Sequence, residues 1–460
     1  NRQPSACEAD ALPLSYCPFY LFFNLFPLPL IRRYCKQERR GFYYLSSVLF
    51  LWLSFHSSYF IIQPFKNDIK FKDMKKAIVF GAGQIGRGFI GELCFDSGYF
   101  IVFVDVDEKI IDKLNKEKEY PVYLLGDKKE EKVIKNFKGL SLKNEREIIN
   151  EIIDTEIIFT SVGAKNLFTL SQIIATGIKE KFKKNGGFLN IVICENLLEA
   201  GKKLKDSILK TGILEETEIK YFEENVGFVE TVISRMTSPL TEDEKSKNPL
   251  LVKVEPYKIL PVDRNGFKGK IPEIVGFLPV DNLHKYEELK LFGHNLSHVS
   301  LAYPGFLKGY TYIWECIEDN EIFELLKNVQ SEVKEALTKK YKFSKGELEE
   351  YFSDLNKRFG NKLLSDTIYR VGREPLRKIG RNERIAGGIN LCLQFNIFPE
   401  NICFVLASVL CYNYSSDEEA VKIQNIIEEK GIDFILREIC GIENVNVINE
   451  VKGNYRRLKN

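Results

Sequence analysis

The sequence predicts an α/β domain built around a parallel sheet, followed by an all-α C-terminal domain. Two patterns carry this prediction. From Lys75 to about residue 280, short apolar runs alternate with stretches of helical spacing, which is typical of β-α-β units and a parallel sheet. Beyond about Glu287, almost every segment has helical spacing.

The first domain is expected to begin with a strand at Lys76–Phe80, an apolar run that ends in glycines. Continuous runs of this kind are typical of parallel strands buried on both faces. Helical spacing follows over Gln84–Ser97, and a second apolar run, Phe100–Val104, ends in Asp105. The remaining elements expected here are a charged amphipathic helix at Glu108–Lys118, strands at Glu156–Thr160 and Leu189–Ile193, and a β-rich segment at Leu250–Val262.

Two capping patterns mark helices in the second domain. Ser344 with Glu347 forms a capping box, and the helix that it opens can stop at Gly360. Ser416 with Glu419 predicts a second box farther along the chain. Both boxes support the all-α character of the C-terminal half.

Residues 1–73 differ from the rest of the chain. They carry aromatic and leucine-rich runs, whereas alternating apolar and charged sequence begins at Met74. Two interpretations stay open: upstream sequence absent from the mature protein, or an anchor, because Phe42–Ile62 has no charged residue and about 20 residues span a membrane. We expect a leader at 1–73, the α/β domain at 74–280 and the all-α domain at 281–460.

The bulk composition indicates a soluble globular body. The 460 residues are 44% hydrophobic and 28% charged, and the net charge of +2 gives no reason to expect a nucleic-acid or membrane partner. The cysteines after Met74 are odd in number and contain no C-x-x-C pair, so neither a disulfide framework nor a zinc ribbon fits. They resemble small buried apolar residues of a reducing compartment, and we therefore expect a cytoplasmic protein.

A glycine motif follows the first predicted strand and opens the first predicted helix. It reads Gly81-Ala82-Gly83-Gln84-Ile85-Gly86, which is the G-x-G-x-x-G spacing. The first glycine permits a tight turn, the second lets the backbone approach a pyrophosphate, and the third lets helix and strand pack closely. The start of the helix offers free N–H groups to the phosphates. These features predict a Rossmann-type dinucleotide-binding domain.

Asp105 ends the next predicted strand, 19 residues after Gly86. A carboxylate there accepts hydrogen bonds from ribose hydroxyls and repels a 2′-phosphate, so NAD is expected rather than NADP. The end of a later strand, Ser161-Val162-Gly163, is expected to line the nicotinamide side. The predicted cofactor-binding residues are Gly81, Gly83, Gln84, Ile85, Gly86, Asp105, Val162 and Gly163.

A second group of residues suits hydride transfer to a ketone, which needs a proton donor for the nascent alkoxide. Lys290, Asn295 and His298 form a K-x-x-x-x-N-x-x-H pattern on a predicted helix, and at ~100° per residue all three can face one cavity. A lysine acts as acid and base when burial lowers its pKa. From the pattern alone, a solvated helix face or a stray metal pair of His294 with His298 stays open, although no Glu or Cys stands at zinc spacing.

Five motifs occur in order between about residue 74 and the end of the chain: GAGQIGRGFIGEL, ICENL, NVGFVET, KLFGHNLSH and VGREPLRKIGRNERI. Together they resemble the polyol-specific long-chain dehydrogenases. The resemblance implies metal-independent catalysis with Lys290 as general acid and base and His298 as its orienting neighbour. It also implies an oxyanion hole formed by Asn295 and Asn196. Asn196 independently follows a predicted parallel strand, where open α/β sheets bind ligands.

A basic cluster points to a phosphorylated ligand. Six basic side chains fall within fifteen residues: Arg370, Arg373, Arg377, Lys378, Arg381 and Arg384. Guanidinium groups bind phosphate through paired hydrogen bonds, although a solvated basic helix face stays open from the pattern alone. Pro375 interrupts a plain helix, and the segment resembles the sugar-phosphate version of this region in the family. The leading candidates for a phosphate contact are Arg373, Arg377 and Lys378.

The resemblance implies NAD(H)-dependent interconversion of D-mannitol 1-phosphate and D-fructose 6-phosphate by a monomer or small homo-oligomer. The alternatives are a family relative acting on free mannitol or on hexuronates, and a non-catalytic NAD-binding regulator, which would have no use for a proton donor. One departure from the family pattern is Ser234 before Arg235, where relatives carry an acidic residue. Since a serine hydroxyl carries no charge, we do not count Ser234 as a substrate contact.

Overall fold

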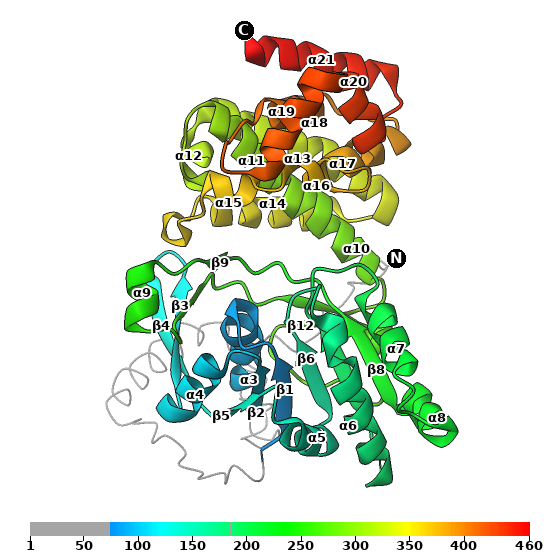
Figure 1. The fold of residues 1–460 in the computed structure, drawn as a ribbon. Coiled ribbons are helices and arrows are strands. Elements are labelled where there is room, and N and C mark those ends of the chain that lie inside the picture. The colour runs from blue at the N-terminus through cyan, green and yellow to red at the C-terminus, as the bar shows by residue number, and fades with distance from the viewer. Residues whose placement is uncertain (1–73, 185) are drawn as a thin grey trace, which may run out of the picture. The chain divides into compact units, whose positions relative to one another are not determined.

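The computed structural model describes residues 74–184 and 186–460, so the predicted leader, residues 1–73, lies outside the described part. Within that part we find no helix with the length and hydropathy of a membrane span. An α/β domain runs to Val280, and helices follow from Leu283 (Figure 1). The predicted fold class is confirmed.

The centre of the α/β domain is a parallel sheet with the strand order β5-β2-β1-β6-β7-β8. The strands are β1 (Lys76–Phe80), β2 (Phe100–Asp105), β5 (Phe137–Ser141), β6 (Ile157–Thr160), β7 (Leu189–Ile193) and β8 (Val226–Glu230). From β1 the chain adds strands first on one side and then on the other. The order therefore reverses between β1 and β6, and open α/β sheets bind ligands beyond the carboxyl ends of their strands at such a point.

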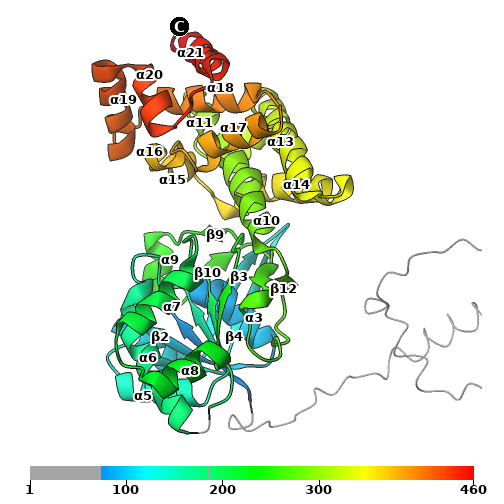
Figure 2. The ribbon, with the colours of Figure 1, turned by 90° about the vertical axis from the view of Figure 1, so that its right-hand side faces the viewer.

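Helices cover both faces of this sheet because its strands bury apolar side chains on both sides (Figures 1 and 2). One face packs against α5 (Glu145–Ile153), α6 (Ser171–Lys183) and α7 (Ala200–Lys210). The other packs against α3 (Gly91–Asp96) and α4 (Glu108–Glu117). Two apolar cores hold the sheet in place and fix where its carboxyl edge lies.

A second, smaller sheet was not predicted from the sequence. Strands β3 (Tyr120–Leu125) and β4 (Lys129–Ile134) form an antiparallel hairpin, and β3 pairs with β10 (Val252–Val254), which in turn pairs with β9 (Thr237–Ser238). β4 opens with Lys-Glu-Glu-Lys, largely exposed, which hides the alternation of an ordinary strand. β4 therefore depends on its pairing with β3, whereas β3 buries Tyr120, Val122 and Leu125 of its own apolar sequence.

Short elements complete the α/β domain. The β-rich segment predicted at Leu250–Val262 contains β10 and the start of β11 (Leu260–Asp263), which pairs in parallel with β12 (Phe277–Val280). Helices α8 (Glu216–Asn225) and α9 (Glu242–Lys247) lie between the strands in sequence. The β-rich prediction is thus correct in kind, although two short strands replace one long segment.

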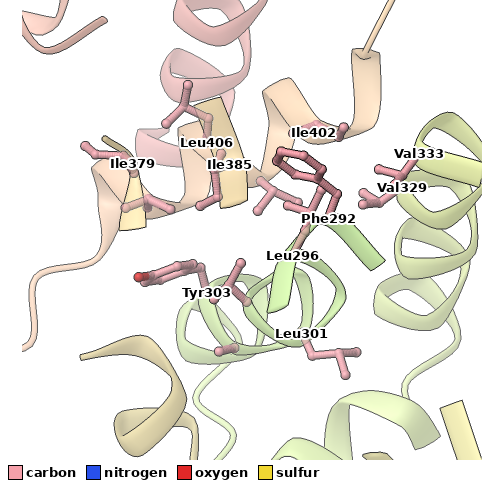
Figure 3. Packing of buried hydrophobic residues seen from close by; sticks show 14 of the residues in the cluster. Phe292, Leu296, Leu301, Tyr303, Val329, Val333, Ile379, Ile385, Ile402 and Leu406 are labelled. Carbon is pink, nitrogen blue, oxygen red and sulfur yellow. The ribbon is translucent and has the colours of Figure 1, made fainter. Parts of the chain in front are cut away.

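The C-terminal domain is helical throughout, as Figures 1 and 2 show. Its main elements are α10 (Leu283–Glu288), η6 (Leu289–Asn295), α11 (Leu296–Leu307), α12 (Ile313–Glu318), α13 (Asn320–Tyr341), α14 (Lys345–Phe359), α15 (Ile368–Gly372), α16 (Pro375–Lys378), α17 (Arg384–Gln394), α18 (Glu400–Cys411), α19 (Glu418–Lys430), α20 (Ile432–Phe434), η8 (Ile435–Ile439) and α21 (Val445–Lys459). Its core surrounds η6 and α11. There Phe292 and Leu296 lie among Ile385, Ile402 and Leu406 (Figure 3).

One of the two predicted capping boxes forms. The hydroxyl of Ser344 accepts from the Glu347 amide, and Gly360 follows the helix, as expected. The second box was wrong: α19 is capped by Asp417, whose carboxylate accepts from the amides of Glu419 and Ala420. A carboxylate one residue nearer the helix offers a charge-assisted cap, so it replaces the serine.

The seven cysteines after Met74 are buried and unpaired. Burial raises the pKa of each thiol, for example that of Cys316 and Cys392 to about 12. The expectation that they serve as small apolar residues is confirmed by this burial.

A buried ion pair fixes the α/β domain internally. Arg235 Nη1 lies 2.6 Å from Glu92 Oε2, and both side chains are fully withdrawn from solvent. Lys132 and Lys258 approach the other oxygen of Glu92 at 3.0 and 2.7 Å. Burial alone would raise the pKa of Glu92, but the field of Arg235 and of the lysines outweighs it, so the pKa is lowered. The carboxylate is therefore held as an anion inside the domain.

We expect Arg235→Met to lower the free energy of unfolding by about 3–5 kcal/mol, because it leaves Glu92 as a buried charge without its buried partner. Urea unfolding followed by circular dichroism measures the change. Arg264→Met is the matched control, since Arg264 pairs with Asp281 at 2.8 Å on the exposed surface and such pairs contribute about 0–1 kcal/mol. Equal losses in the two variants would show that the buried pair is not what holds the domain.

Candidate functional site

The glycine turn connects β1 to the first helix. Gly81 has a φ of +98°, and a side chain there would overlap the carbonyl oxygen of Ser161. A side chain at Gly86 would overlap the carbonyl oxygen of Gly81, so helix and strand can approach only at a glycine. A Cβ at Gly83 would meet no protein atom within 4 Å. The turn is thus closed at its first and third glycines and open at its second, which fits a pyrophosphate-binding turn.

The helix after the turn begins at Gln84 and Ile85 and continues as a π-helix, η3 (Gly86–Ile90). Arg87 is buried behind the turn, where its Nε donates to the Ala82 carbonyl at 2.6 Å and its Nη1 donates to the carbonyl of Leu250. Burial lowers the pKa of this guanidinium. Arg87 was not among the predicted site residues, and its role in the structure is to hold the turn.

Asp105 lies at the end of β2, beside the same turn. Its Oδ2 accepts from the Ala82 amide at 2.6 Å, and its Oδ1 accepts from the Asp107 amide at 2.9 Å. Each oxygen keeps a lone pair for a further donor. A carboxylate in this position accepts ribose hydroxyls and repels a 2′-phosphate, so the residues present fit NAD.

The ends of β6 and β7 meet through Glu195, a residue that the sequence analysis did not select. Its two carboxylate oxygens accept from the backbone amides of Val162 and Gly163, at 2.8 and 2.9 Å. Burial raises the pKa of Glu195, although the two amides oppose that shift. Asn196 follows directly and its side chain is exposed. Two predicted cofactor residues and one predicted oxyanion residue therefore adjoin the same carboxylate.

Lys290 and Asn295 lie on a π-helix, η6, and not on the α-helix that the sequence analysis assumed. A π-helix bonds i to i+5, so residues five apart lie one above the other. Both side chains are half-buried. The hydroxyl of Tyr351 lies 3.5 Å from the Leu289 carbonyl, close to the wide turn. The α-helical spacing was wrong, and the π-helix brings Lys290 and Asn295 onto one face more closely than that spacing would.

The amine of Lys290 is largely withdrawn from water. Burial first, and then the charge of Arg384, lower its pKa to about 8, while Glu287 opposes the shift. Arg384 begins α17, which packs on η6 because Gly387 and Gly388 leave room for Phe292 and Leu296. The side-chain packing thus brings a second cation near the lysine and holds the pKa of its amine at about 8.

His298 lies on α11, directly after η6. Its ring stacks on Phe359 with centroids 4.7 Å apart, and its Nε2 lies 2.9 Å from Oδ2 of Asp366 without an aligned hydrogen bond. Burial lowers the pKa of His298 despite this neighbour, whereas the imidazole and Arg370 overcome burial and lower the pKa of Asp366 to about 2. The histidine is therefore neutral at pH 7 and faces a fixed anion.

The predicted basic cluster spans α15, α16 and the start of α17. Arg373 and Arg377 are exposed, and Arg377 Nε donates to Glu374 at 2.9 Å. Lys378 is buried, and its amine donates to the carbonyls of Val371 and Arg373. Burial, then Arg384 and Arg377, lower the pKa of Lys378 to about 7. The cluster thus combines exposed arginines (Arg373, Arg377 and Arg381), two less exposed ones (Arg370 and Arg384) and one buried lysine.

Arg358 of α14 joins the helical domain to the α/β domain. Its Nε and Nη2 donate to the two oxygens of Glu255 at 2.8 and 2.7 Å, and Nη2 also donates to the Ser234 carbonyl at 2.7 Å. Asn361 donates to the carbonyl of Leu125 at 2.7 Å. Ser234, the departure from the family pattern, takes part in this contact between the domains through its backbone carbonyl.

The predicted residues fall into three groups, one of which is the basic cluster with Arg373, Arg377 and Lys378. The glycine turn, Asp105, Val162, Gly163 and Asn196 adjoin the carboxyl ends of parallel strands, and Lys290, Asn295 and His298 lie on one continuous helix. Among the described residues, no hydrogen bond joins Asn196 to that helix. Residues 74–184 and 186–460 contain no group of three or more His, Cys, Asp or Glu side chains placed to hold a metal ion.

Sequence reasoning missed Glu195, Asp366 and Arg87. Glu195 had a usable signal, because it precedes Asn196 at a strand end where ligands bind. Asp366 lies 68 residues beyond His298 in a segment without periodicity, so only the fold brings the two together. Arg87 follows the glycine motif directly but reads as an ordinary helix residue.

An open glycine turn with an acidic strand end, at the switch point of a parallel sheet, is typical of nucleotide-dependent oxidoreductases. Residues 75–276 match the mannitol dehydrogenase Rossmann domain, and residues 282–459 match the mannitol dehydrogenase C-terminal domain. The chain belongs to the mannitol dehydrogenase family. Its activity class is NAD-dependent polyol oxidoreduction.

Curated relatives align over most of the chain. A mannitol-1-phosphate 5-dehydrogenase of Thermoanaerobacter pseudethanolicus is 37% identical over 387 residues, covering 84% of this chain and 98% of the relative. One of Clostridium acetobutylicum is 38% identical over 386 residues, covering 84% and 99%. One of Bacillus subtilis is 37% identical over 368 residues, covering 80% and 95%.

Two solved structures share the fold. Substrate-free D-sorbitol dehydrogenase has a TM-score of 0.72 at 16% identity, covering 85% of this chain and 94% of that one. Mannitol 2-dehydrogenase of Pseudomonas fluorescens, in a ternary complex with NAD and D-mannitol, has a TM-score of 0.65 at 18% identity, covering 84% and 92%. At these identities the likeness concerns the fold alone.

We expect Gly83→Ala to weaken NADH binding at least tenfold while leaving thermal stability unchanged, because the new methyl group meets no protein atom and projects into the space of a pyrophosphate. NADH fluorescence titration and a melting curve measure the two quantities. Gly98→Ala is the comparison, since a side chain there is also free of contacts but its positive φ strains the backbone, so stability falls and binding persists. Unchanged NADH affinity in Gly83→Ala would remove the turn from the cofactor site.

Proposed function

We propose that this chain interconverts D-mannitol 1-phosphate and D-fructose 6-phosphate with NAD(H) and without metal. The names of the curated relatives support this substrate pair. The observation that carries the chemistry is the Lys290 amine, whose pKa burial and Arg384 lower to about 8. A group that titrates near the working pH can both give and take a proton.

Lys290 acts as the general acid in ketose reduction and as the general base in polyol oxidation. In reduction its ammonium protonates the carbonyl oxygen of the ketose, and in oxidation its neutral amine takes the hydroxyl proton. Nicotinamide cofactor, when bound, supplies or accepts the hydride at the substrate carbon. Burial of the amine favours this role. It lowers the pKa of Lys290 to about 8, so the protonated and neutral forms are both populated near that pH.

The two asparagines and the histidine orient the substrate. Asn295, on the same π-helix as Lys290, and Asn196, at the end of β7, each offer an amide donor to the reacting oxygen. His298 is neutral and stands against Asp366, so a nitrogen of its ring is free to hold the lysine or a substrate hydroxyl. Val162 and Gly163 line the nicotinamide side of the site, and Gly81, Gly83, Gln84, Ile85, Gly86 and Asp105 hold the adenosine and pyrophosphate side.

The substrate phosphate binds at the basic cluster. Arg373 and Arg377 present exposed guanidinium groups, which bind phosphate through paired hydrogen bonds. Lys378 already donates to two carbonyls and has a third N–H for a phosphate oxygen. Its pKa of about 7 rises when a phosphate dianion is beside it, so the lysine becomes a full cation on binding.

The setting of the enzyme follows the same proposal. A sugar phosphate carries charge and does not cross membranes, so an enzyme that uses one works in the cytoplasm, where the buried free thiols of this chain also stay reduced. We propose a monomer or small homo-oligomer there, with the small sugar phosphate as its partner and neither nucleic acid nor membrane involved.

Replacing Lys290 by Ala is expected to lower turnover about 10²–10⁴-fold while NADH binding stays nearly intact, because only the proton donor is lost. In the unaltered protein, the rate of fructose 6-phosphate reduction should fall as pH rises through about 8, where the amine loses its proton. Polyol oxidation should rise through the same range. Steady-state absorbance of NADH at a series of pH values measures both limbs.

Lys327→Ala is the matched control, since Lys327 lies on α13 of the same domain with its side chain in solvent. It should change neither turnover nor the pH profile. Loss of NADH binding in Lys290→Ala would show that the lysine is structural, and a profile flat between pH 7 and 9 would remove it as the acid and base.

Arg373→Ala is expected to raise the KM for fructose 6-phosphate about tenfold or more, because a charge-assisted pair of hydrogen bonds to the phosphate is lost. The kinetics with fructose should stay unchanged, since fructose has no phosphate. Arg437→Ala, an exposed arginine elsewhere in the helical domain, is the control. A clear preference of the unaltered enzyme for fructose or tagaturonate over fructose 6-phosphate would overturn the substrate assignment.

A further inference from the structure

Glu195 lies where the ends of β6 and β7 run side by side. These strands are parallel neighbours, with Thr160 opposite Ile193, and the Cys194 amide donates to the Thr160 carbonyl at 3.0 Å. Beyond that last rung the side chain of Glu195 replaces the ladder. Its carboxylate bridges the two strand ends by accepting from Val162 and Gly163, one amide to each oxygen.

The two amides that Glu195 binds match the two oxygens of a carboxylate. Gly163 has a φ of +86°, so the amides of Val162 and Gly163 form a small concave donor pair. A carboxylate supplies two acceptors to two donors, whereas a glutamine would turn an NH₂ group toward one of the N–H groups. The geometry therefore favours a carboxylate over an amide side chain at this position.

The charge of Glu195 is nevertheless without a counterion. Among the described residues, no Lys, Arg or His nitrogen lies within 4.0 Å of this carboxylate, and the influences on its pKa are burial and hydrogen bonds from its neighbours. The side chain is half-buried, so water screens it only in part. Its field is thus free to act on whatever binds beyond the ends of β6 and β7.

Glu195 lies on the side of the glycine turn where the proposed function places the nicotinamide. Ser161, which precedes the bridged amides, donates to the Phe80 carbonyl at 2.7 Å and touches the glycine turn through its hydroxyl. The carboxylate Asp105 is on the opposite side of that turn, at β2, where an adenine ribose binds. The strand order therefore assigns Asp105 to the adenosine half and Glu195 to the other half.

We propose that Glu195 is a positioning residue that fixes the Val162–Gly163 amides and that its negative charge favours the oxidised cofactor over the reduced one. The inference rests on the proposed function in one respect, that Val162 and Gly163 line the nicotinamide side. The nicotinamide ring carries a positive charge in NAD⁺ and none in NADH, so a nearby anion stabilises only the former. At an effective dielectric constant of about 20, two unit charges about 12 Å apart interact strongly enough to change a dissociation constant about tenfold.

The test measures binding of NAD⁺ and of NADH separately, without polyol, by calorimetry and by NADH fluorescence. Glu195→Gln should raise the ratio Kd(NAD⁺)/Kd(NADH) about threefold to tenfold. Glu199→Gln is the matched control, because it removes the same charge from an exposed position four residues farther along the same connection. Its ratio should stay within about twofold of that of the unaltered protein.

A second variant separates charge from positioning. Glu195→Asp keeps the charge but is too short to reach both amides, so both dissociation constants should rise together with their ratio nearly unchanged. This variant also decides the matter if melting curves show that Glu195→Gln does not fold. Equal weakening of both cofactors in Glu195→Gln, or a shifted ratio in Glu195→Asp, would overturn the effect of the charge.

These outcomes are distinct from a failure of the proposed function. A wrong polyol assignment would appear in the assays with fructose 6-phosphate and would leave the ratio of cofactor affinities as expected. Absence of binding for both cofactors in the unaltered protein would instead contradict the dinucleotide site itself, and with it the role of Glu195.

Discussion

The packing of η6 against α17 is the constraint on which the environment of the Lys290 amine depends. Lys290 keeps a pKa of about 8 only because η6 is packed firmly against α17, and that packing requires the adjacent glycines at the start of α17. The same contact brings Arg384 near the amine. A wide π-turn supplies the register, because it aligns Lys290 and Asn295. The core packing and the helix geometry therefore together determine the proton affinity of Lys290.

In the α/β domain, carboxylates at strand ends serve the backbone. Asp105 and Glu195 each accept two amides of the loops that follow or adjoin their strands. Carboxylates there tie neighbouring loops together while leaving lone pairs for a ligand. Arg87 complements them as a donor, because its guanidinium binds backbone carbonyl oxygens. The loops beyond the sheet are therefore shaped by side-chain charges, whereas the sheet below them is held by apolar packing on its two faces.

The sequence was sufficient where a pattern is local. Apolar runs located four strands of the parallel sheet, β1, β2, β6 and β7, whereas β5 and β8 were not predicted. The Ser344 box located a helix start. It failed where a distant partner decides. The β3–β4 hairpin pairs with β10 from far along the chain, and Asp366 meets His298 only in the fold. The capping error was local, because Asp417 caps the helix in place of its neighbour Ser416. The π-turn at Lys290 also escaped, since the residue types of this segment suit an α-helix equally well. The glycine turn and the lysine helix could be proposed as sites from the sequence. The residues that hold them in place, Arg87, Glu195 and Asp366, were not proposed.

The seven cysteines have a chemical consequence of their own. A thiol reacts as its thiolate, and burial keeps each of these sulfurs protonated and out of reach of reagents. Alkylating agents and mild oxidants therefore meet them only after the surrounding helix or strand has opened. Cys403 and Cys411 share α18, and the other five lie on α3, α12 and α17 or directly after β7 and η8, so together the sulfurs report the opening of six parts of the molecule. The chain thus carries its own set of labels for local unfolding.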